Sequence, residues 1–434
     1  MSKLIPIQIP YSHTKLEATI PKENFSFIGN LPIHRGIKDW TKKLLKTLDH
    51  PTGCPALSSI INSQDQILIL VEDNTRHTPV KEILPILLNY ILDLGVKTPQ
   101  IEIMIAPGTH RLLTGDELLE KLGVDIIEKY RVYQHDFLDE KSLADLGTLE
   151  VDGIEIPVQV NKKAVEADFV IGIGNIIPHP NAGFSGGAKI LAPGICGKST
   201  ISGIHKASAL LGYLPLGIME NSCRQIIEEV AKKAGLKFIV NVVLDPDNQV
   251  MDIVAGDVIK AHREGALIAR NIYGIPIDEP AEIVITSSAP YDIDYWQCEK
   301  ALISSYSCVK EGGIVIFAGP CLEGLAHNHD DLLSWFSYTY QEASQIVKAI
   351  KPFDDSHDLV AAGIAMGATL VGEKARIFIV TEGLTDEQIL HLGYTRFPGL
   401  QEAVNAALNE IPKGKVLVLP RGGDCMPYLK TGQE

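Results

Sequence analysis

Short runs of apolar, largely β-branched residues recur along the chain, separated by stretches with the spacing of amphipathic helices. The runs have too few polar residues for strands with one face in water, so they predict buried strands of parallel sheets. They occupy residues 66–73, 100–107, 168–175, 237–245, 281–288, 313–320, 375–382 and 415–423. Strands alternating with helices predict an α/β fold with two mostly parallel sheets flanked by helices.

The length of 434 residues suggests two or three domains, at about 100–200 residues per domain. Residues 271–280 place a glycine and two prolines between a helical stretch and a new strand, which favours a domain boundary. We expect an N-terminal α/β domain at 1–273 that binds a cofactor and performs catalysis. A C-terminal α/β domain at 274–434 would face it across the active-site cleft, and its last residues could pack back on the first domain.

Residues 151–164 alternate apolar and polar residues around an Asp-Gly pair, which predicts a local hairpin or edge strand.

Composition limits the possible partners. The net charge of −15 disfavours nucleic acid, because phosphate-backbone binding needs a basic face, but a small anionic substrate can still bind a locally positive pocket. The 7 cysteines are scattered without a CxxC pair, which predicts reduced thiols. The N-terminus has no signal-peptide core and no run is long enough to span a bilayer, so we expect a cytoplasmic protein without a membrane partner.

The segment from Gly172 to Lys206 has a mixture of residues that folding alone does not require. It combines His179, Lys189 and His205 with many glycines and almost no acidic charge. Glycines let backbone approach a ligand, and a lysine beside a Gly-Gly pair can meet a phosphate or bond covalently to a cofactor. Histidines supply metal ligands and proton carriers. The segment therefore predicts the wall of a cofactor pocket.

Two nucleotide-binding motifs are incomplete in this segment. Residues 197–200 end like a P-loop, but Ala192 stands where its first glycine belongs and no buried strand precedes the run. Gly172 and Gly174 lack the third glycine of a dinucleotide fingerprint, and prolines follow them. We expect neither nucleotide-triphosphate hydrolysis nor a conventional NAD site.

Polar and titratable residues follow four of the predicted strands. Ligands of open parallel sheets bind beyond the carboxyl ends of the strands, so these residues are candidates for one active site. They are Asp73, Thr75 and Arg76 after the first strand, His110 after the second, Asn175 and His179 after the third, and Trp296, Gln297 and Lys300 after 281–288.

Each candidate histidine also has an ordinary structural explanation. His110 could bond to loop backbone, His179 could be a surface residue of a proline-rich loop, and His205 could pack on a helix that begins near Ser199. Three further histidines are expected at the surface, namely His77, His327 and His329.

The charged candidates have similar alternatives. Asp73 and Arg76 could cap a turn and form a surface ion pair. Gln297 and Lys300, at positions i and i+3, could belong to a solvated helix face.

In their order and spacing, these motifs resemble the nickel-dependent lactate racemase family and its 2-hydroxyacid racemase and epimerase relatives. The resemblance covers most of the N-terminal half and the start of the C-terminal half, and its most specific part is the PHP…GGAK…PG…H block. It depends on residues 73–79 (DNTRHTP), 106–111 (APGTHR), 178–194 (PHPNAGFSGGAKILAPG), the helix reaching His205, and 295–302 (YWQCEKAL).

The resemblance implies an isomerase that acts on a 2-hydroxy acid by hydride transfer to and from a nickel-pincer nucleotide. This cofactor is a pyridinium-3,5-bisthiocarboxylic acid mononucleotide, which would come from cofactor-biosynthesis proteins. Lys189 matches the lysine that can tether it covalently, and His205 matches the nickel ligand. His110 and His179 match the two catalytic acid/base histidines.

The resemblance also implies roles for the remaining candidates. Substrate binding is implied for Arg76, Gln297 and Lys300, with Trp296 supplying bulk where this chain has His357 in place of a tryptophan common in the family. Roles in holding the cofactor or ordering the site are implied for Asp73, Thr75, Gly186 and Gly187.

Two other functions stay open on the residues alone. One is a metal-dependent hydrolase or lyase with His110, His179 and His205 as direct metal ligands. The other is a non-catalytic protein that binds or carries a nucleotide.

Overall fold

The computed structural model describes residues 3–327, 329–351, 354 and 357–430. Contacts divide the chain into two compact units. We call His34–Ala207 with Ile218–Asn271 the central unit, and Met1–Ile33, Ser208–Gly217 and Ile272–Glu434 the terminal unit.

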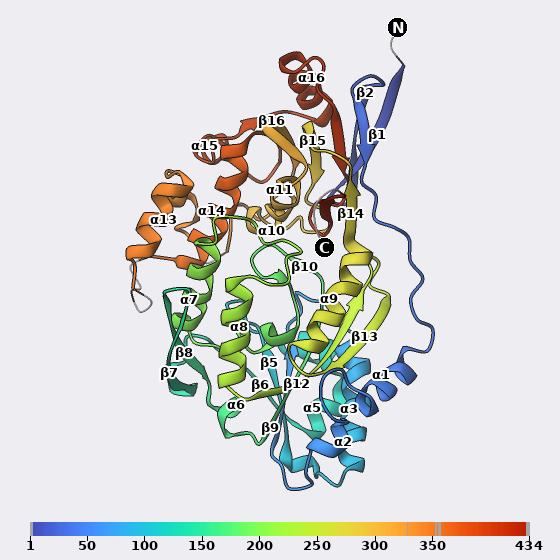
Figure 1. The fold of residues 1–434 in the computed structure, drawn as a ribbon, viewed down its shortest axis with the longest axis vertical. Helices are drawn as coiled ribbons and strands as arrows, with labels where there is room; N and C mark the ends of the chain where they lie inside the picture. The colour runs from blue at the N-terminus through green and yellow to red at the C-terminus, as the bar shows by residue number, and fades with distance from the viewer. Residues whose placement is uncertain (1–2, 328, 352–353, 355–356, 431–434) are drawn as a thin grey trace. The chain divides into compact units, whose positions relative to one another are not determined.

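The central unit contains a six-stranded sheet (Figure 1). All neighbouring strands are parallel except the edge pair β12–β13. The order is β13 (Val250–Gly256), β12 (Leu236–Leu244), β9 (Phe169–Asn175), β4 (Ile67–Glu72), β5 (Ile101–Ala106) and β6 (Arg131–Gln134). Four of the predicted apolar runs are confirmed as strands of this sheet.

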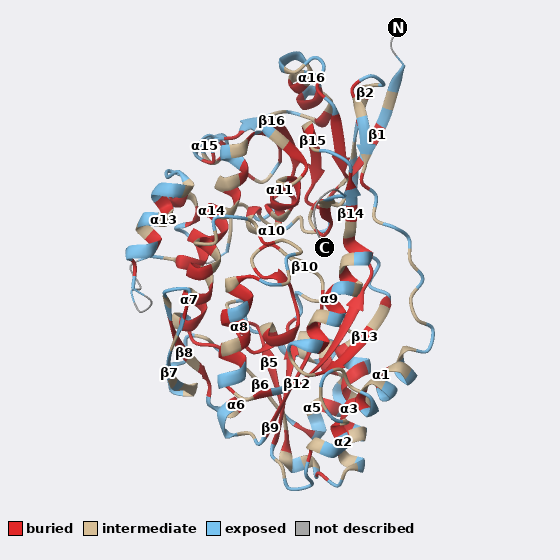
Figure 2. Cartoon of the chain, viewed as in Figure 1, coloured by how far each residue is buried: buried red, intermediate tan, exposed pale blue. Residues whose placement is uncertain are grey.

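Helices cover both faces of this sheet because its central strands are apolar on both sides. Every residue of β4 is buried, and Figure 2 shows the buried residues along the strands. One face packs in a single core with α1 (Trp40–Asp49) and α3 (Val80–Asp93). The short helix η3 (Gly187–Ile190) contacts β4 and β9, and α8 (Ser222–Lys233) contacts η3.

Two local elements of the central unit match their sequence patterns. Strands β7 (Leu143–Val151) and β8 (Ile154–Asn161) form an antiparallel hairpin, as the alternation at 151–164 predicts. Helix α7 (Lys198–Ala209) confirms the helix expected to reach His205.

The terminal unit contains a second six-stranded sheet, and all of its neighbouring strands are parallel. The order is β18 (Thr395–Arg396), β17 (Ala375–Val380), β16 (Val309–Ala318), β15 (Ala281–Ser287), β19 (Val416–Leu419) and β3 (Phe25–Ile28). The remaining four predicted runs are confirmed as strands here.

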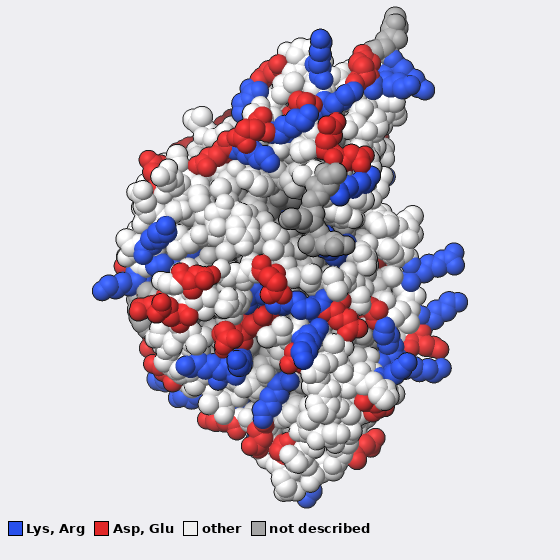
Figure 3. Space-filling model, viewed as in Figure 1, with Lys and Arg blue, Asp and Glu red and all other residues white. Residues whose placement is uncertain are grey.

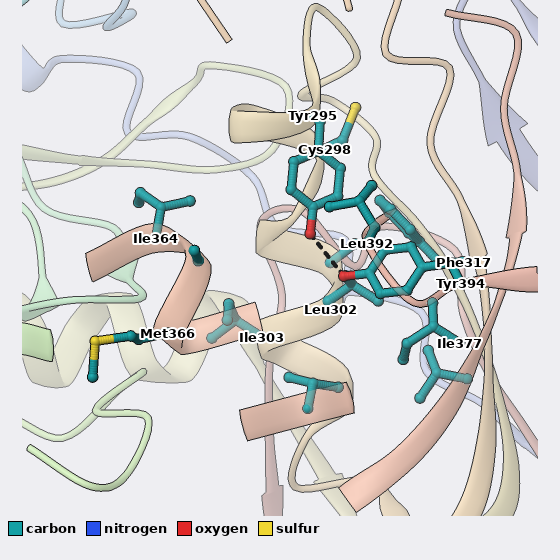
Figure 4. Close-up of a cluster of buried hydrophobic side chains, with 14 of the residues drawn as sticks. Tyr295, Cys298, Leu302, Ile303, Phe317, Ile364, Met366, Ile377, Leu392 and Tyr394 are labelled. Carbon is teal, nitrogen blue, oxygen red and sulfur yellow. Dashed lines mark hydrogen bonds between the residues drawn. The ribbon is translucent and has the colours of Figure 1, made fainter. Parts of the chain in front are cut away.

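Alternate residues of this sheet form two cores. Phe317 belongs to a core with helices α11 (Lys300–Ser305) and α14 (Leu359–Lys374), part of which Figure 4 shows. Ile316 belongs to the other core, with α16 (Leu400–Glu410) and the N-terminal hairpin. That hairpin consists of β1 (Leu4–Tyr11) and β2 (Thr14–Pro21).

The units differ from the expected division at 273/274 because the N-terminal segment joins the terminal unit. Strand β3 pairs with β19, and the β1–β2 hairpin packs on the same sheet. The segment Ser208–Gly217 also belongs to the terminal unit. The last described strand, β20 (Met426–Leu429), pairs with β14 (Gly274–Ile277), so it stays with the terminal unit.

Acidic and basic side chains are interspersed on the molecular face that Figure 3 shows. Across the part of the chain that the structure describes, no helix combines the length and apolar character needed to cross a membrane.

Candidate active site

Three of the strand ends predicted to converge do lie next to one another. In the central sheet β4 stands between β9 and β5, with Glu72 opposite Ala106 and Val71 opposite Ile173. The loops after these strands therefore start at one edge of the sheet, as expected for a parallel sheet. The fourth predicted strand end follows β15, which belongs to the sheet of the terminal unit.

Asp73 and His110 form a hydrogen-bonded pair at this edge. His110 Nδ1 lies 2.6 Å from Asp73 Oδ2, and the carboxylate is 4% exposed whereas the imidazole is 42% exposed. Burial opposes ionisation of Asp73, but the bonds to His110 and Thr75 and the charge of Arg76 outweigh it and lower the pKa of this carboxyl. An ionised carboxylate requires the proton on Nδ1, so Nε2 of neutral His110 is a proton acceptor.

The other oxygen of Asp73 closes a turn. Asp73 Oδ1 accepts hydrogen bonds from Thr75 N at 3.1 Å and from Thr75 Oγ1 at 2.6 Å. Arg76 Nη1 donates to Thr75 O and Oγ1 at 3.2 and 3.1 Å. The turn-cap alternative is thus confirmed alongside the pairing with His110, whereas Arg76 makes no ion pair among the described residues.

Lys121 holds this loop from α4 (Gly115–Leu122). Its Nζ donates to Asp73 O at 2.7 Å and to Arg76 O at 3.0 Å. Sequence reasoning missed Lys121, since a lysine near the end of an amphipathic helix is typical of a solvated face.

His179 lies in a short ladder beyond β9, formed by β10 (Pro178–His179) and β11 (Gly183–Phe184). The backbone N–H of Asn181 donates to His179 Nδ1 over 3.1 Å. Because Nδ1 accepts this bond, the neutral ring has its proton on Nε2. The two predicted acid/base histidines are therefore in opposite tautomers when neutral.

The loop that leads to Lys189 is held by a buried arginine that sequence reasoning missed. Arg224 of α8 is 1% exposed. It donates to Ala182 O and Gly186 O at 3.3 Å each and also to Phe184 O. A sequence signal existed, because Arg224 lies on the same buried helix face as Ile227 and Ala231.

His262 supports the same loop from α9 (Lys260–Tyr273). This imidazole is 0% exposed, and its Nε2 lies 2.9 Å from Ser185 O. Burial, with the charges of Arg224 and Arg263, lowers the pKa of His262, so the ring is neutral and donates from Nε2.

Lys189 is half-buried on η3. Burial, together with the positive charge of Arg224, lowers the pKa of its amine to about 8. An appreciable fraction of the amine is then unprotonated near neutral pH, and only the unprotonated amine is a nucleophile. This environment fits a lysine that bonds covalently to a cofactor.

Gly186 and Gly187 are required by the fold itself. Both have positive φ, at 70° and 60°. A Cβ on Gly186 would lie 2.7 Å from Asn175 O, and one on Gly187 would lie 2.7 Å from His262 Cδ2. The N–H of Gly187 donates to Asn241 Oδ1 over 2.7 Å. These contacts explain both glycines without a ligand, and their contact with a cofactor phosphate stays a prediction.

His205 is half-buried on α7. Among the residues that the structure describes, no three His, Cys, Asp or Glu side chains form a group that could hold a metal ion. His110, His179 and His205 therefore do not make a direct three-ligand metal site. A single imidazole fits a nickel ion whose other donors come from an organic group.

The predicted substrate residues of the terminal unit lie on two consecutive short helices, α10 (Tyr295–Cys298) and α11. Lys300 Nζ donates to Gln297 Oε1 at 2.6 Å and lies 3.8 Å from the centroid of the Tyr291 ring. The contact between Gln297 and Lys300 shows that the pair forms a fixed polar group, and their role in substrate binding stays a prediction.

His329 was expected at the surface, and this expectation is wrong. Its side chain is 16% exposed and stacks on Trp296, whereas His77 and His327 are exposed as expected. His357 is also exposed, with its ring 5.9 Å from that of Trp335.

Comparison with known proteins gives a consistent result. A sequence model described as the lactate racemase N-terminal domain matches residues 11–211. The chain is 31% identical over 428 residues to the lactate racemase of Thermoanaerobacterium thermosaccharolyticum, covering 96% of this chain and 97% of the relative. It is 31% identical over 339 residues to the lactate racemase of Lactiplantibacillus plantarum, covering 76% and 79%.

Solved structures agree with the sequence comparisons. The lactate racemase apoprotein of T. thermosaccharolyticum has a TM-score of 0.85 and 28% identity, covering 98% of this chain and 100% of that chain. A protein of Thermotoga maritima has a TM-score of 0.67 and 20% identity, covering 90% and 98%, and shares the fold. Because the first relative matches nearly the whole chain, this protein belongs to the lactate racemase family and is a racemase, an enzyme of the isomerase class.

Proposed function

We propose that this chain racemises or epimerises a 2-hydroxy acid, either lactate or a related 2-hydroxycarboxylate, with a nickel-pincer nucleotide as its cofactor. The observation that best supports the proposal is the pair of His110 with the buried carboxylate of Asp73. This pair presents a partly exposed imidazole with a defined tautomer at the carboxyl edge of a parallel sheet.

The chemistry explains why a base alone is insufficient. Removing the proton from Cα of a 2-hydroxy acid is difficult, because the adjacent carboxylate is a poor electron sink. A bound cofactor of this kind would supply a hydride acceptor for the Cα hydrogen. His110 Nε2 takes the hydroxyl proton as the hydride leaves, and the negative charge of Asp73 stabilises the resulting imidazolium.

Inversion requires a second group for the other enantiomer. The planar 2-keto acid turns over within the site, and its oxygen then points away from His110. His179 is the proposed acid/base group for this orientation: protonated His179 gives its Nε2 proton to the substrate oxygen, and in the reverse direction Nε2 takes the hydroxyl proton. Exchange with solvent restores the protonation of both histidines. Acid/base assistance of this kind contributes about 10²- to 10⁴-fold to the rate.

Two cations are suited to a substrate carboxylate. Arg76 offers a planar guanidinium that can bind a carboxylate through two parallel hydrogen bonds. Lys300 offers an ammonium that is oriented by Gln297. Both are assigned to substrate binding in this proposal.

Two residues would hold the cofactor. The Lys189 amine, with its pKa lowered to about 8, suits a covalent tether. The His205 imidazole suits a single nickel bond. Direct metal-dependent hydrolysis is disfavoured by the lack of a three-ligand group among the described residues.

The test uses the full chain, produced with the cofactor-making machinery, and single enantiomers of several 2-hydroxy acids. We expect each enantiomer of a substrate to give the same final mixture, measured by chiral chromatography. We also expect His110→Ala and His179→Ala to retain nickel but lose racemisation. Nickel-loaded enzyme that converts none of the acids would contradict the proposal, and nucleotide binding without turnover would favour a carrier.

A further inference from the structure

A second Asp–His pair lies in the terminal unit, and the proposed reaction does not use it. His329 Nδ1 is 2.6 Å from Asp358 Oδ2. Asp358 is also the N-cap of α14, where its Oδ1 accepts from the backbone N–H groups of Val360 and Ala361 at 3.0 Å each. Both carboxylate oxygens are engaged, so the position of the imidazole is fixed.

The His329 ring is also held by stacking. It lies against the indole of Trp296 with the ring centroids 4.2 Å apart and an interplanar angle of 26°. Nδ1 faces Asp358 and one ring face is covered by Trp296, whereas Nε2 has no hydrogen-bond partner among the described residues. An oriented imidazole with an unused nitrogen is a binding group for an oxygen atom.

Trp296, on which His329 stacks, belongs to the same helical segment as the proposed substrate residues Gln297 and Lys300. Its neighbour Tyr295 is fully buried and shares a 2.7 Å hydrogen bond with Tyr394 (Figure 4), which anchors α10 in the core. Trp296 and Lys300 are four positions apart on α10 and α11, so they start from the same side of this helical segment. The cation for a carboxylate thus lies on the same anchored element as the indole against which the His329 imidazole stacks.

We propose that His329 Nε2 hydrogen-bonds an oxygen on the side chain of the 2-hydroxy acid, so that the enzyme prefers polar over alkyl side chains. This inference rests on the proposed function and adds the substrate class to it. Neutral imidazole can accept a hydrogen bond from a substrate hydroxyl, and imidazolium can donate one to a second carboxylate. An alkyl side chain would leave Nε2 without a partner after water is excluded, which costs free energy.

The test compares glycerate with 2-hydroxybutyrate, because the two side chains have nearly the same size and differ by a hydroxyl in place of a methyl. We expect kcat/KM of the cofactor-loaded enzyme to favour glycerate by about tenfold or more, in the range of one lost hydrogen bond. Malate, whose side chain ends in a carboxylate, tests whether His329 binds a second carboxylate. Preference for glycerate would identify a hydroxyl partner and preference for malate a carboxylate partner, and either result supports the proposal.

The decisive variant is His329→Phe, which keeps an aromatic ring against Trp296 and removes Nε2. We expect the kcat/KM ratio of glycerate or malate to 2-hydroxybutyrate to fall towards one, because no Nε2 is left to bind a polar side chain or to stay unpaired beside an alkyl one. His329→Gln keeps a hydrogen-bonding group and should retain part of the preference even if the phenylalanine variant folds poorly. His327→Phe, at an exposed histidine nearby in sequence, should change neither ratio.

Failure of the specificity proposal is distinguishable from failure of the proposed function. An enzyme that racemises all three acids with equal kcat/KM, or whose preference survives His329→Phe, would overturn the role of His329 alone. An enzyme that racemises no 2-hydroxy acid would overturn the proposed function and this inference together.

Discussion

The two Asp–His pairs of this molecule have the same contact and opposite exposure. In both, the imidazole Nδ1 lies 2.6 Å from a carboxylate oxygen. At Asp73–His110 the carboxylate is 4% exposed and the imidazole 42% exposed, whereas at Asp358–His329 the values are 25% and 16%. In the first pair a partly exposed imidazole bonds to a buried carboxylate. In the second pair the indole of Trp296 covers one face of the imidazole.

This difference in exposure suits the two Asp–His pairs to different roles, proton transfer for the first and substrate recognition for the second. Proton transfer requires an imidazole that meets the substrate oxygen and a fixed charge that stabilises its protonated form. Recognition requires an imidazole that is held still, with one nitrogen left to bind. We therefore expect substitutions at the first pair to change the rate and substitutions at the second to change the selectivity.

The largest effect is expected for Asp73→Asn. Asparagine no longer requires the proton on Nδ1 of His110 and provides no charge for the imidazolium. We expect kcat to fall by about 10²- to 10⁴-fold with nickel content unchanged. Steady-state kinetics and metal analysis measure both quantities. A loss of less than about threefold would show that the pair does not take part in proton transfer.

Lys189 should differ strongly from ordinary lysines. With its pKa lowered to about 8, the amine is protonated below pH 8 and unprotonated above it, whereas ordinary lysines titrate near about 10.4. Amine-reactive labelling of the cofactor-free chain, followed by peptide mass spectrometry, should show a midpoint near pH 8 at Lys189. Arg224→Met should raise that midpoint, since it removes a neighbouring positive charge. A midpoint near 10 in the unmodified chain would contradict the role given to burial.

Arg224→Met should also destabilise the central unit. The substitution leaves the carbonyls of Ala182, Phe184 and Gly186 without their donor, at a cost of about 2–4 kcal/mol in the free energy of unfolding. Hydrogen exchange should show the loss in the central unit and leave the terminal unit unchanged. The matched control Arg376→Met, at an exposed ion pair with Glu410, should cost less than about 1 kcal/mol. Equal effects would show that the hydrogen bonds of Arg224 stabilise the unit no more than an exposed ion pair does.

The smallest effect is expected for Asp358→Asn, which mirrors Asp73→Asn at the second pair. Asparagine is as good an N-cap as aspartate, so the stability of α14 should change by less than about 0.5 kcal/mol. We expect kcat for 2-hydroxybutyrate to stay within about threefold and the preference for a polar side chain to weaken. A fall in kcat as large as that of Asp73→Asn would show that the second pair also acts in the reaction.

The strands were predictable from the sequence because a short, continuous, β-branched apolar run in a chain of this composition is typical of a buried strand. All the predicted runs form strands, and the Asp-Gly alternation forms the β7–β8 hairpin. The pairing of β3 with β19 was missed. A strand of 4 residues with exposed positions has little apolar signal, and its partner lies at the other end of the chain.

The candidate site was predictable where its residues follow the carboxyl ends of neighbouring parallel strands. Asp73 and His110 follow neighbouring parallel strands, and such strand ends meet at one edge. His329 was missed because its role depends on burial, and a histidine in a loop is typical of a surface. Arg224 was missed although it falls on the apolar face of its helix, because a charged residue on a helix is typical of a surface. Only tertiary contacts distinguish His329 from the exposed His77 and His327.

Racemisation of a single enantiomer in D₂O tests the central claim most directly. If His110 takes only the hydroxyl proton and the Cα hydrogen moves as a hydride, the inverted product keeps its original hydrogen at Cα. We predict complete racemisation with no deuterium at Cα, measured by NMR and mass spectrometry of the recovered acid. Deuterium at Cα that accumulates in step with inversion would show that the protein removes the Cα proton, and would contradict the proposed mechanism.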